Sequence, residues 1–306
     1  MITIGLPRGL YYFKHYVLWE EFFRNLGCDI VVSDETNKHI LDMGVKYCSN
    51  ETCLPVKVFH GHVMSLKDKV DYIFIPRYIS VDKNEYTCPN FCGLPDMTAL
   101  NLKNQVKILD INVHIDMFPY LILKSLKELG KVLNLEYSYV VNALKEAYLV
   151  FTKKQESSNN FEPFNSIKDK TKISLSILGH PYMIYDSYLS MKLIEKLNKR
   201  NISIYTPDNI DNITKRINAY PFQGKIFWDI GFELLGSAFT FTSNEVVDGI
   251  IYLTPFACGV DAFILEFIQR RFKSSDSLPI LKLTVDEHTG EAGFDTRVEA
   301  FLDMVG

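Results

Sequence analysis

The chain has 306 residues, of which 47% are hydrophobic and 23% charged, enough for one large or two medium-sized cores. Its formal net charge is −4, so it lacks the basic field that holds nucleic acid. No apolar run reaches the ~18 residues that a membrane-spanning helix needs, and the N-terminus lacks the basic and apolar regions of a signal peptide. We therefore expect a cytoplasmic protein with neither a membrane nor a nucleic-acid partner.

The first part of the chain predicts a parallel sheet. A strand at residues 2–6, a helix at 11–26 that ends at Gly27, and a strand at 29–33 form a βαβ unit. Cys28, which opens the second of these strands, is predicted to be a small buried residue. Further elements follow in chain order: a short helix at 37–44, a helix at 54–66, a strand at 70–76, a strand within 106–115, and helical sequence at 117–153.

Polar sequence at residues 157–172 separates this part from a second α/β pattern. Its predicted strands are 173–178, 202–205, 247–253 and 279–285, and its predicted helices are 187–198, 227–238, 260–272 and 294–305. The expected fold class is therefore α/β, with two Rossmann-like parallel-sheet domains and a cleft between them. The expected domains are an N-terminal α/β domain (1–116), a helical connection with a polar linker (117–170), and a C-terminal α/β domain (171–306).

Six cysteines in a cytoplasmic chain are more typical of core residues, nucleophiles or metal ligands than of disulfides. Cys53 precedes the predicted helix at 54–66, where unpaired N–H groups and the helix dipole favour a thiolate. Cys88 and Cys92 lie in a predicted long loop, residues 77–94, after a strand, where open α/β sheets bind ligands. Cys258 lies just beyond the predicted strand at 247–253.

Thiolates on three such segments favour a soft metal, either zinc or an iron–sulfur cluster. The spacing does not match a compact ferredoxin motif, and the pairs Cys48–Cys53 and Cys88–Cys92 are wider than the usual zinc-ribbon pair. Spacing alone therefore leaves both a metal site and reduced core cysteines open.

Several long and unusual segments carry a resemblance to a known family. The sequence resembles the acyl-CoA dehydratase activase-related proteins of the 2-hydroxyacyl-CoA dehydratase and benzoyl-CoA reductase-like iron–sulfur superfamily, over nearly the whole chain. The matching segments are residues 4–10 (IGLPRGL), 53–58 (CLPVKV), 61–63 (GHV), 71–77 (DYIFIPR), 88–89 (CP), 93–96 (GLPD), 179–182 (GHPY), 255–259 (PFACG) and 286–292 (DEHTGEA).

This resemblance implies one cluster per subunit, most simply [4Fe-4S], held by cysteines at the matching positions Cys53, Cys88 and Cys258. Some members of the superfamily carry a double-cubane [8Fe-9S] cluster held by more cysteines. Cys48 and Cys92 depart from the pattern and would be either additional ligands or incidental thiols.

The superfamily also implies a partner, an ATP-hydrolysing iron–sulfur activase that delivers a low-potential electron for a small-molecule substrate in anaerobic metabolism. The chain has no Walker-type phosphate-binding motif, so ATP binding is assigned to the separate activase. A homo- or hetero-dimer is expected by the same analogy.

Other polar residues offer weaker candidates. His180, at a strand end, and Glu287 and His288, after the last strand, are candidates for acid–base catalysis; a structural turn and a helix cap are the competing interpretations. Arg8 follows the first strand and would hold an anion or be structural. Lys57 and His62 lie near Cys53, and Lys57 is interpreted as a solvated charge or one that supports the metal site.

Three functions remain open from the sequence. The first is an iron–sulfur reductase or dehydratase-like enzyme that uses the three cysteines. The second is a non-catalytic electron-transfer or scaffold subunit that carries a cluster. The third is a zinc-stabilised binding protein that uses Cys48, Cys53, Cys88 and Cys92, with no role for Cys258.

Overall fold

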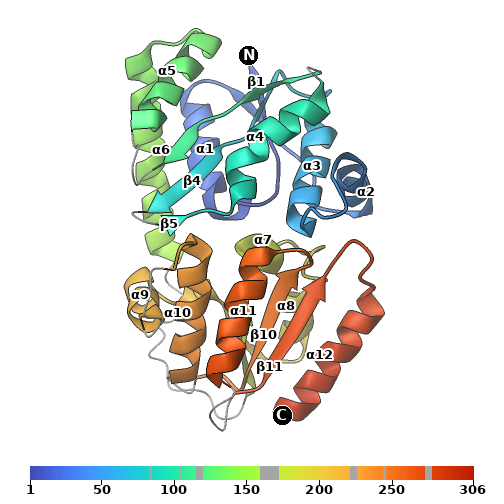
Figure 1. Cartoon of the computed structure of the whole chain (residues 1–306). Coiled ribbons are helices and arrows are strands. Elements are labelled where there is room, and N and C mark those ends of the chain that lie inside the picture. Colours follow the sequence, from blue (N-terminus) through green and yellow to red (C-terminus); the bar gives the residue numbers. More distant parts are fainter. Residues whose placement is uncertain are drawn as a thin grey trace. The chain divides into compact units, whose positions relative to one another are not determined.

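The computed structural model (Figure 1) is an α/β protein with parallel sheets, which confirms that part of the predicted fold class. Two compact units are present: unit 1 comprises residues 1–158 with 227–229, and unit 2 comprises 159–226 with 230–306. Each unit has its own parallel sheet. The structure describes residues 1–82, 85–103, 105–114, 120–158, 172–220, 226–243, 246–272 and 278–306.

The main sheet of unit 1 has four parallel strands in the order β2-β1-β3-β6. Helix α1 (Tyr12–Asn25) connects the first two strands, which confirms the predicted βαβ unit. The strands are β1 (Thr3–Leu6), β2 (Asp29–Val32), β3 (Tyr72–Phe74) and β6 (Lys107–Leu109).

A second sheet of unit 1 is formed by β4 (Arg77–Asp82), β5 (Glu85–Tyr86) and β7 (Asn112–His114). The chain passes from β3 into β4 across Pro76, which has no N–H to donate to a neighbouring strand. Backbone pairing continues on both sides of this break, from Ile75 N to Leu109 O and from Arg77 N to Ile111 O, each at 2.9 Å. The strand predicted within 106–115 is therefore two short strands.

The predicted long loop at residues 77–94 is wrong. Strands β4 and β5 occupy its first part, and helix α4 (Pro89–Leu102) begins within it. Two prolines and a glycine near the start of α4 resemble turn sequence, which is why the pattern did not predict a helix. Pro89 is tolerated at the first helical position, and burial of Phe91, Leu94 and Leu102 outweighs the disturbance from Pro95 inside the helix.

Two further helices of unit 1, α2 (Lys38–Tyr47) and α3 (Leu54–Leu66), pack with very close backbones. A Cβ atom on Gly44 would lie 1.8 Å from the Lys57 carbonyl oxygen, and one on Gly61 would lie 1.9 Å from the Ile40 carbonyl oxygen. Only glycine at these positions permits the observed approach. Helix α3, which Cys53 precedes, is therefore fixed against α2 by backbone contact.

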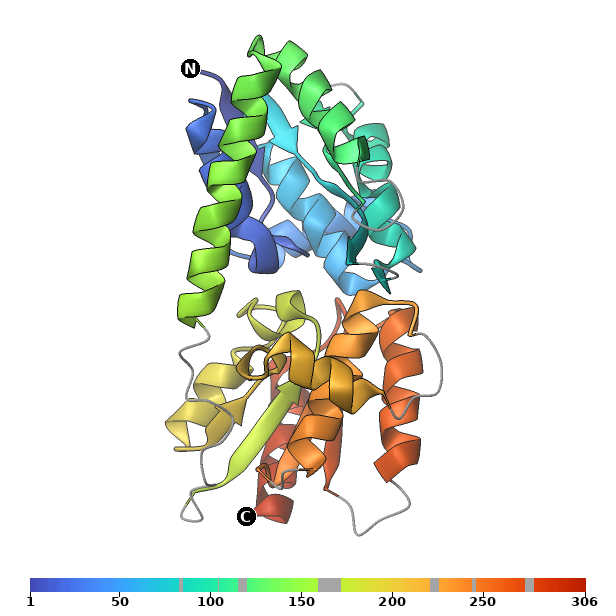
Figure 2. The same ribbon diagram turned by 90° about the vertical axis from the view of Figure 1, so that its left-hand side faces the viewer.

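Helices α5 (Tyr120–Leu133) and α6 (Tyr137–Ser158) also belong to unit 1. Helix α6, the long green helix of Figure 2, packs beside α1, and α5 packs on β7. The predicted boundary between residues 116 and 117, and residues 159–170 of the predicted linker, lie outside the described residues.

Unit 2 has a four-stranded parallel sheet in the order β11-β10-β8-β9. Its central strand β10 is buried along its whole length, as expected for a strand covered on both faces. The strands are β8 (Ser174–Leu178), β9 (Ser203–Tyr205), β10 (Gly249–Pro255) and β11 (Ile280–Val285).

The helices of unit 2 differ from prediction mainly before β10. The helix predicted at 187–198 is α8, beginning six residues later, and it is preceded by the short helix α7. The pattern did not predict η1 or α9. The helical segments are α7 (Pro181–Ile184), α8 (Leu193–Lys199), η1 (Pro207–Asn209), α9 (Asn212–Ala219), α10 (Asp229–Ser243), α11 (Gly259–Phe272) and α12 (Glu291–Val305). Among the described residues, no helix combines the length and hydrophobicity needed to cross a membrane.

Candidate metal centre

Cys53 is the N-cap residue of α3, with an extended backbone (φ −63°, ψ 148°). Pro55 lies in the first turn of the helix, where its missing N–H removes no helical hydrogen bond. The side-chain amide of Asn90 points to Cys53, with Nδ2 at 4.0 Å from Sγ. The Cys53 sulfur therefore lies at the positive end of a helix dipole, within reach of a polar donor from α4.

The loop that carries Cys48 and Cys53 is fixed by Lys57. Its Nζ donates a 3.0 Å hydrogen bond to the carbonyl of Asn50, and the residue is only 2% exposed. The interpretation of Lys57 as a solvated charge is therefore wrong, because α3 is buried along nearly its whole length. Burial raises the pKa of the Cys48 thiol to about 11, although Lys57 opposes the shift.

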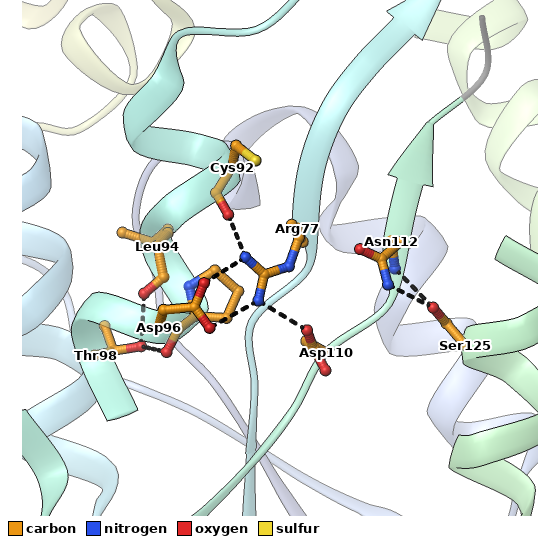
Figure 3. Close-up of polar contacts among 9 residues, drawn as sticks. Arg77, Cys92, Leu94, Asp96, Thr98, Asp110, Asn112 and Ser125 are labelled. Carbon is orange, nitrogen blue, oxygen red and sulfur yellow. Dashed lines mark hydrogen bonds and ion pairs between the residues drawn. The ribbon is translucent and has the colours of Figure 1, made fainter. Parts of the chain in front are cut away.

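Cys88 is the N-cap residue of α4, and Cys92 lies in the early part of that helix. Figure 3 shows how Arg77, at the start of β4, holds this segment: Nη1 donates to the Cys92 carbonyl and to Asp96 Oδ2, both at 2.6 Å. Arg77 Nη2 also donates to Asp96 Oδ1 and to Asp110. The hydrogen bond from Arg77 holds the pKa of the Asp96 carboxyl below its usual range. This network fixes the N-terminal part of α4 to the β4 and β6–β7 segments.

Cys53 and Cys88 thus have the same local setting within unit 1. Each directly precedes a helix that carries a proline in its first turn. Asn90, in the first turn of α4, connects the beginnings of the two helices through its contact with Cys53. Exposed helical N–H groups favour negative charge, so both positions suit thiolates or an anionic cluster.

An apolar pocket lies near these two helices. It encloses about 440 Å³ of space, part of it open to solvent. Leu6 and Phe74 contribute to its lining from the ends of β1 and β3, Phe59 from α3, and Phe91 and Leu94 from α4. A pocket with this apolar lining suits an apolar part of a small molecule, at the strand ends where open α/β sheets bind ligands.

Cys258 lies in unit 2, at the carboxyl end of β10 and directly before α11. A turn brings it there, in which Ala257 adopts a left-handed conformation with φ 64°. The Asp261 N–H, in the first turn of α11, points to the Cys258 Sγ at 3.5 Å. The sulfur therefore accepts from the helix in the way that an N-cap oxygen usually does.

His180 faces Cys258 from the neighbouring strand β8, which it follows by two residues. Its Nε2 lies 3.8 Å from the Cys258 Sγ and 3.1 Å from the Asp261 Oδ1. Tyr182 stacks on the imidazole with ring centroids 4.7 Å apart. Gly179 permits the close approach, because a Cβ atom there would lie 2.6 Å from the Leu253 carbonyl oxygen.

The electrostatics of this group centre on Asp261, which is completely buried. Burial alone would lower the pKa of His180, but the Asp261 carboxylate outweighs it, so the pKa lies well above its ordinary value. The Tyr252 hydroxyl donates to Asp261 Oδ1 at 3.1 Å, whereas Asp261 Oδ2 is buried without a hydrogen-bond partner in the described structure. Burial, followed by the nearby Asp261 charge, raises the pKa of Tyr252.

Sequence reasoning singled out Cys258 and His180 but missed Asp261 and Tyr252. The signal for Asp261 was its position three residues after Cys258, which places it in the first turn of the helix that the cysteine precedes. No sequence pattern indicated Tyr252, because a tyrosine within an apolar strand is indistinguishable from a core residue.

The structure brings together one potential ligand set among the described residues. His180, Cys258 and Asp261 each offer one ligand atom, and these atoms lie within 4.8 Å of one another. Cys48, Cys53, Cys88 and Cys92, the zinc ligands of the third hypothesis, form no such set in the described part of the chain. Cys53 and Cys88 belong to unit 1 and Cys258 to unit 2, so a centre shared by all three stays a prediction.

The other candidates have structural partners. Asp286 accepts from the His288 N–H and the Thr289 hydroxyl, which closes the turn after β11, and the His288 side chain is exposed. Glu287 is partly buried beside it. The expected helix cap is not formed by these side chains, because the N-cap residue of α12 is Gly290.

Arg8 and His62 are also accounted for within unit 1. Arg8 forms an ion pair with Glu35 at 3.0 Å, so its partner here is a carboxylate of the chain itself. His62 is fully buried, and its ring nitrogens are hydrogen-bonded to Ser33 at 2.9 Å and Thr36 at 3.0 Å. Burial, followed by the Arg8 charge, lowers the pKa of His62 to about 3. His62 is therefore a neutral side chain that stabilises the fold through its two hydrogen bonds.

Comparison with known proteins gives one family. The family model described as the CoA enzyme activase uncharacterised domain (DUF2229) matches residues 3–210, which include Cys53, Cys88 and His180 but not Cys258. No curated protein matches the chain. A solved LacI family transcriptional regulator from Arthrobacter sp. FB24 is 12% identical, covering 99% of this chain and 90% of its own, with a TM-score of 0.21. That score is too low to support a structural argument.

Proposed function

The chain belongs to the CoA enzyme activase uncharacterised domain family, and on this premise we propose that it is an iron–sulfur protein that works with a separate ATP-hydrolysing activase. In this proposal the activase supplies low-potential electrons, and the protein uses them to reduce or dehydrate a small substrate. Cys53, Cys88 and Cys258 are the proposed cluster ligands, with Cys48 and Cys92 as possible additional ones.

One observation carries the proposal. Each of the three cysteines directly precedes a helix, at the ends of three different segments of the chain. The residue before a helix is usually Ser, Thr, Asn or Asp, so three cysteines at such positions are not explained by capping alone. Helix N-termini stabilise negative charge, which both thiolates and their clusters carry.

The residues present fit a cluster of this kind. All six cysteines are outside disulfides, and the three proposed ligands are partly exposed, so they are open to assembly. When bound, the cluster would supply one-electron transfer at low potential. The chain itself would contribute the thiolates, the N–H groups of the helix starts that lower the energy of negative charge, and the Lys57 and Arg77 hydrogen bonds that fix the two ligand segments of unit 1.

The apolar pocket of unit 1 supports a small substrate with an apolar part. Two of the elements that line it, α3 and α4, are the helices that Cys53 and Cys88 precede. Binding of such a group beside the cluster ligands would place it for reduction. A cluster that is insensitive to added acyl thioesters would instead support the electron-carrier role.

The test is purification without oxygen, followed by an absorption spectrum and analysis of iron, sulfide and zinc. We expect a broad visible absorption band with iron and sulfide in the natural protein, and loss of both in Cys53→Ser and Cys88→Ser. Cys28→Ser is the matched control, because Cys28 is a buried residue directly before β2 and is not a proposed ligand. A full complement of iron and sulfide in Cys53→Ser would refute the ligand assignment.

A further inference from the structure

In the group formed by Cys258, His180 and Asp261, one nitrogen of His180 faces both other side chains and cannot make a good hydrogen bond to each. Both contacts of His180 use the same ring nitrogen, Nε2, which lies 3.8 Å from the Cys258 sulfur and 3.1 Å from Asp261 Oδ1. One imidazole nitrogen carries at most one hydrogen, so it cannot make two good hydrogen bonds at once. Convergence of three different ligand atoms on one point is the arrangement of a metal site.

The distances agree with a tetrahedral ion. Typical zinc bond lengths to sulfur, nitrogen and oxygen place tetrahedral N and O ligand atoms about 3.3 Å apart and S and N atoms about 3.6 Å apart. The structure has 3.1 Å between His180 Nε2 and Asp261 Oδ1, and 3.8 Å between His180 Nε2 and Cys258 Sγ. Both are within a few tenths of an ångström of that geometry, without any movement of the backbone.

Asp261 provides the independent observation. The residue is 0% exposed, and its Oδ2 has no hydrogen-bond partner in the described structure. A buried carboxylate with an unpartnered oxygen is costly, and a cation held at Oδ1, beside His180, would lower that cost by neutralising the carboxylate charge. Oδ1, the ligand atom of the distances above, also accepts from the buried Tyr252 hydroxyl, which is the kind of supporting hydrogen bond that orients metal-binding carboxylates.

A nucleophilic Cys–His–Asp relay is the main competing arrangement, and the geometry disfavours it. In such a relay the acid binds one ring nitrogen while the nucleophile faces the other. Here the acid and the sulfur both face Nε2. The ligand atoms are also held rigidly, because β8 and β10 are neighbouring parallel strands and Tyr182 stacks on His180.

We propose that unit 2 binds one divalent transition-metal ion, zinc or iron(II), through Cys258, His180 and Asp261. A mixed sulfur, nitrogen and oxygen set suits a borderline ion rather than magnesium or calcium. Three protein ligands leave a fourth position for water or a small molecule, as in metal sites that take part in chemistry. The site goes beyond the proposed cluster and requires neither Cys53 nor Cys88. Both proposals use the Cys258 thiolate, so the two centres compete for it, and the ion binds in unit 2 when no cluster holds Cys258.

Cobalt(II) is the probe that tests this site, because tetrahedral cobalt thiolates give strong sulfur-to-cobalt charge-transfer bands and strong visible absorption bands. The full chain carrying Cys53→Ser and Cys88→Ser, purified without metal in a reducing buffer, would be titrated with cobalt chloride. We expect saturation at one equivalent with a sulfur-to-cobalt band, and displacement by zinc. Adding Cys258→Ser should remove that band, and adding His180→Ala or Asp261→Asn should weaken binding at least ~10-fold, as loss of a ligand does.

Two controls keep the result interpretable. Cys28→Ser and His288→Ala change a buried cysteine and an exposed histidine outside the ligand set, and both should leave cobalt binding unchanged. Far-ultraviolet circular dichroism checks that each variant is folded, and Asp261→Glu keeps a carboxylate if Asp261→Asn does not fold. Binding without a sulfur-to-cobalt band, or an equal band in Cys258→Ser, would overturn the inference.

The outcomes also separate the two proposals. If the natural protein holds iron and sulfide but the double-serine variant binds no cobalt, the site in unit 2 is refuted and the cluster stands. If the variant binds cobalt through Cys258 while the natural protein assembles no cluster, the cluster proposal is refuted and the metal site in unit 2 stands.

Discussion

Replacing Gly61 by alanine should destabilise the protein through the contact between α2 and α3. The added Cβ atom would lie 1.9 Å from the Ile40 carbonyl oxygen, whereas real Cβ atoms essentially never approach a heavy atom closer than 3.0 Å. The two backbones must therefore separate by about 1 Å or more, because the obstacle is a main-chain atom that cannot rotate away. Overpacking of this kind typically costs ~1–3 kcal/mol and sometimes more.

Two opposing effects set the expected size. Alanine is favoured over glycine in a helix by about 1 kcal/mol, which offsets part of the loss. We place the contact at the upper end of the overpacking range and expect a net loss of about 2 kcal/mol in the free energy of unfolding. Gly44→Ala should behave similarly, because its Cβ atom would lie 1.8 Å from the Lys57 carbonyl oxygen.

The assay is urea denaturation followed by far-ultraviolet circular dichroism, comparing midpoints at constant slope. Gly93→Ala is the matched control: Gly93 lies within helix α4 of the same unit, and a Cβ atom there meets nothing within 4 Å. That variant should be as stable as the natural protein or more stable, by up to ~1 kcal/mol. If Gly61→Ala matched Gly93→Ala in stability, the argument from backbone contact would be wrong.

Two further predictions concern titration and backbone strain. The pKa of His62 is lowered to about 3 in the folded protein, so the unfolded chain takes up a proton there first as the pH falls below about 6.5. The free energy of unfolding should therefore decrease as the pH falls through this window. Between pH 7 and pH 5, urea midpoints should show a loss about 2 kcal/mol smaller in His62→Asn than in the natural protein. An unchanged pH dependence would contradict the buried neutral histidine. Ala257→Gly should raise the free energy of unfolding by about 0.5 kcal/mol, because glycine removes the left-handed strain at φ 64° but adds entropy to the unfolded chain; a clear loss of stability would show that Ala257 is not strained.

Periodicity and glycine placement in the sequence determined most of the parallel α/β architecture. Helix α3 was predicted with its observed bounds, and the strands of both main sheets were found within a few residues. Local signals suffice here because buried parallel strands are continuous apolar runs and their helices repeat every three to four residues. The N-cap position of Cys53 also followed from the sequence, since Pro55 marks the first turn.

Tertiary contacts decided what these signals could not. Helix α4 exists despite Pro95 because burial of its apolar face outweighs the local preference, so Cys88 and Cys92 are at a helix start and within that helix, not on a long loop. Asp261 became part of a potential metal site only when β8 and β10 paired and brought His180 to Cys258. Spacing along the chain carries no information about such pairing, since the partners are 78 residues apart and meet only through the sheet.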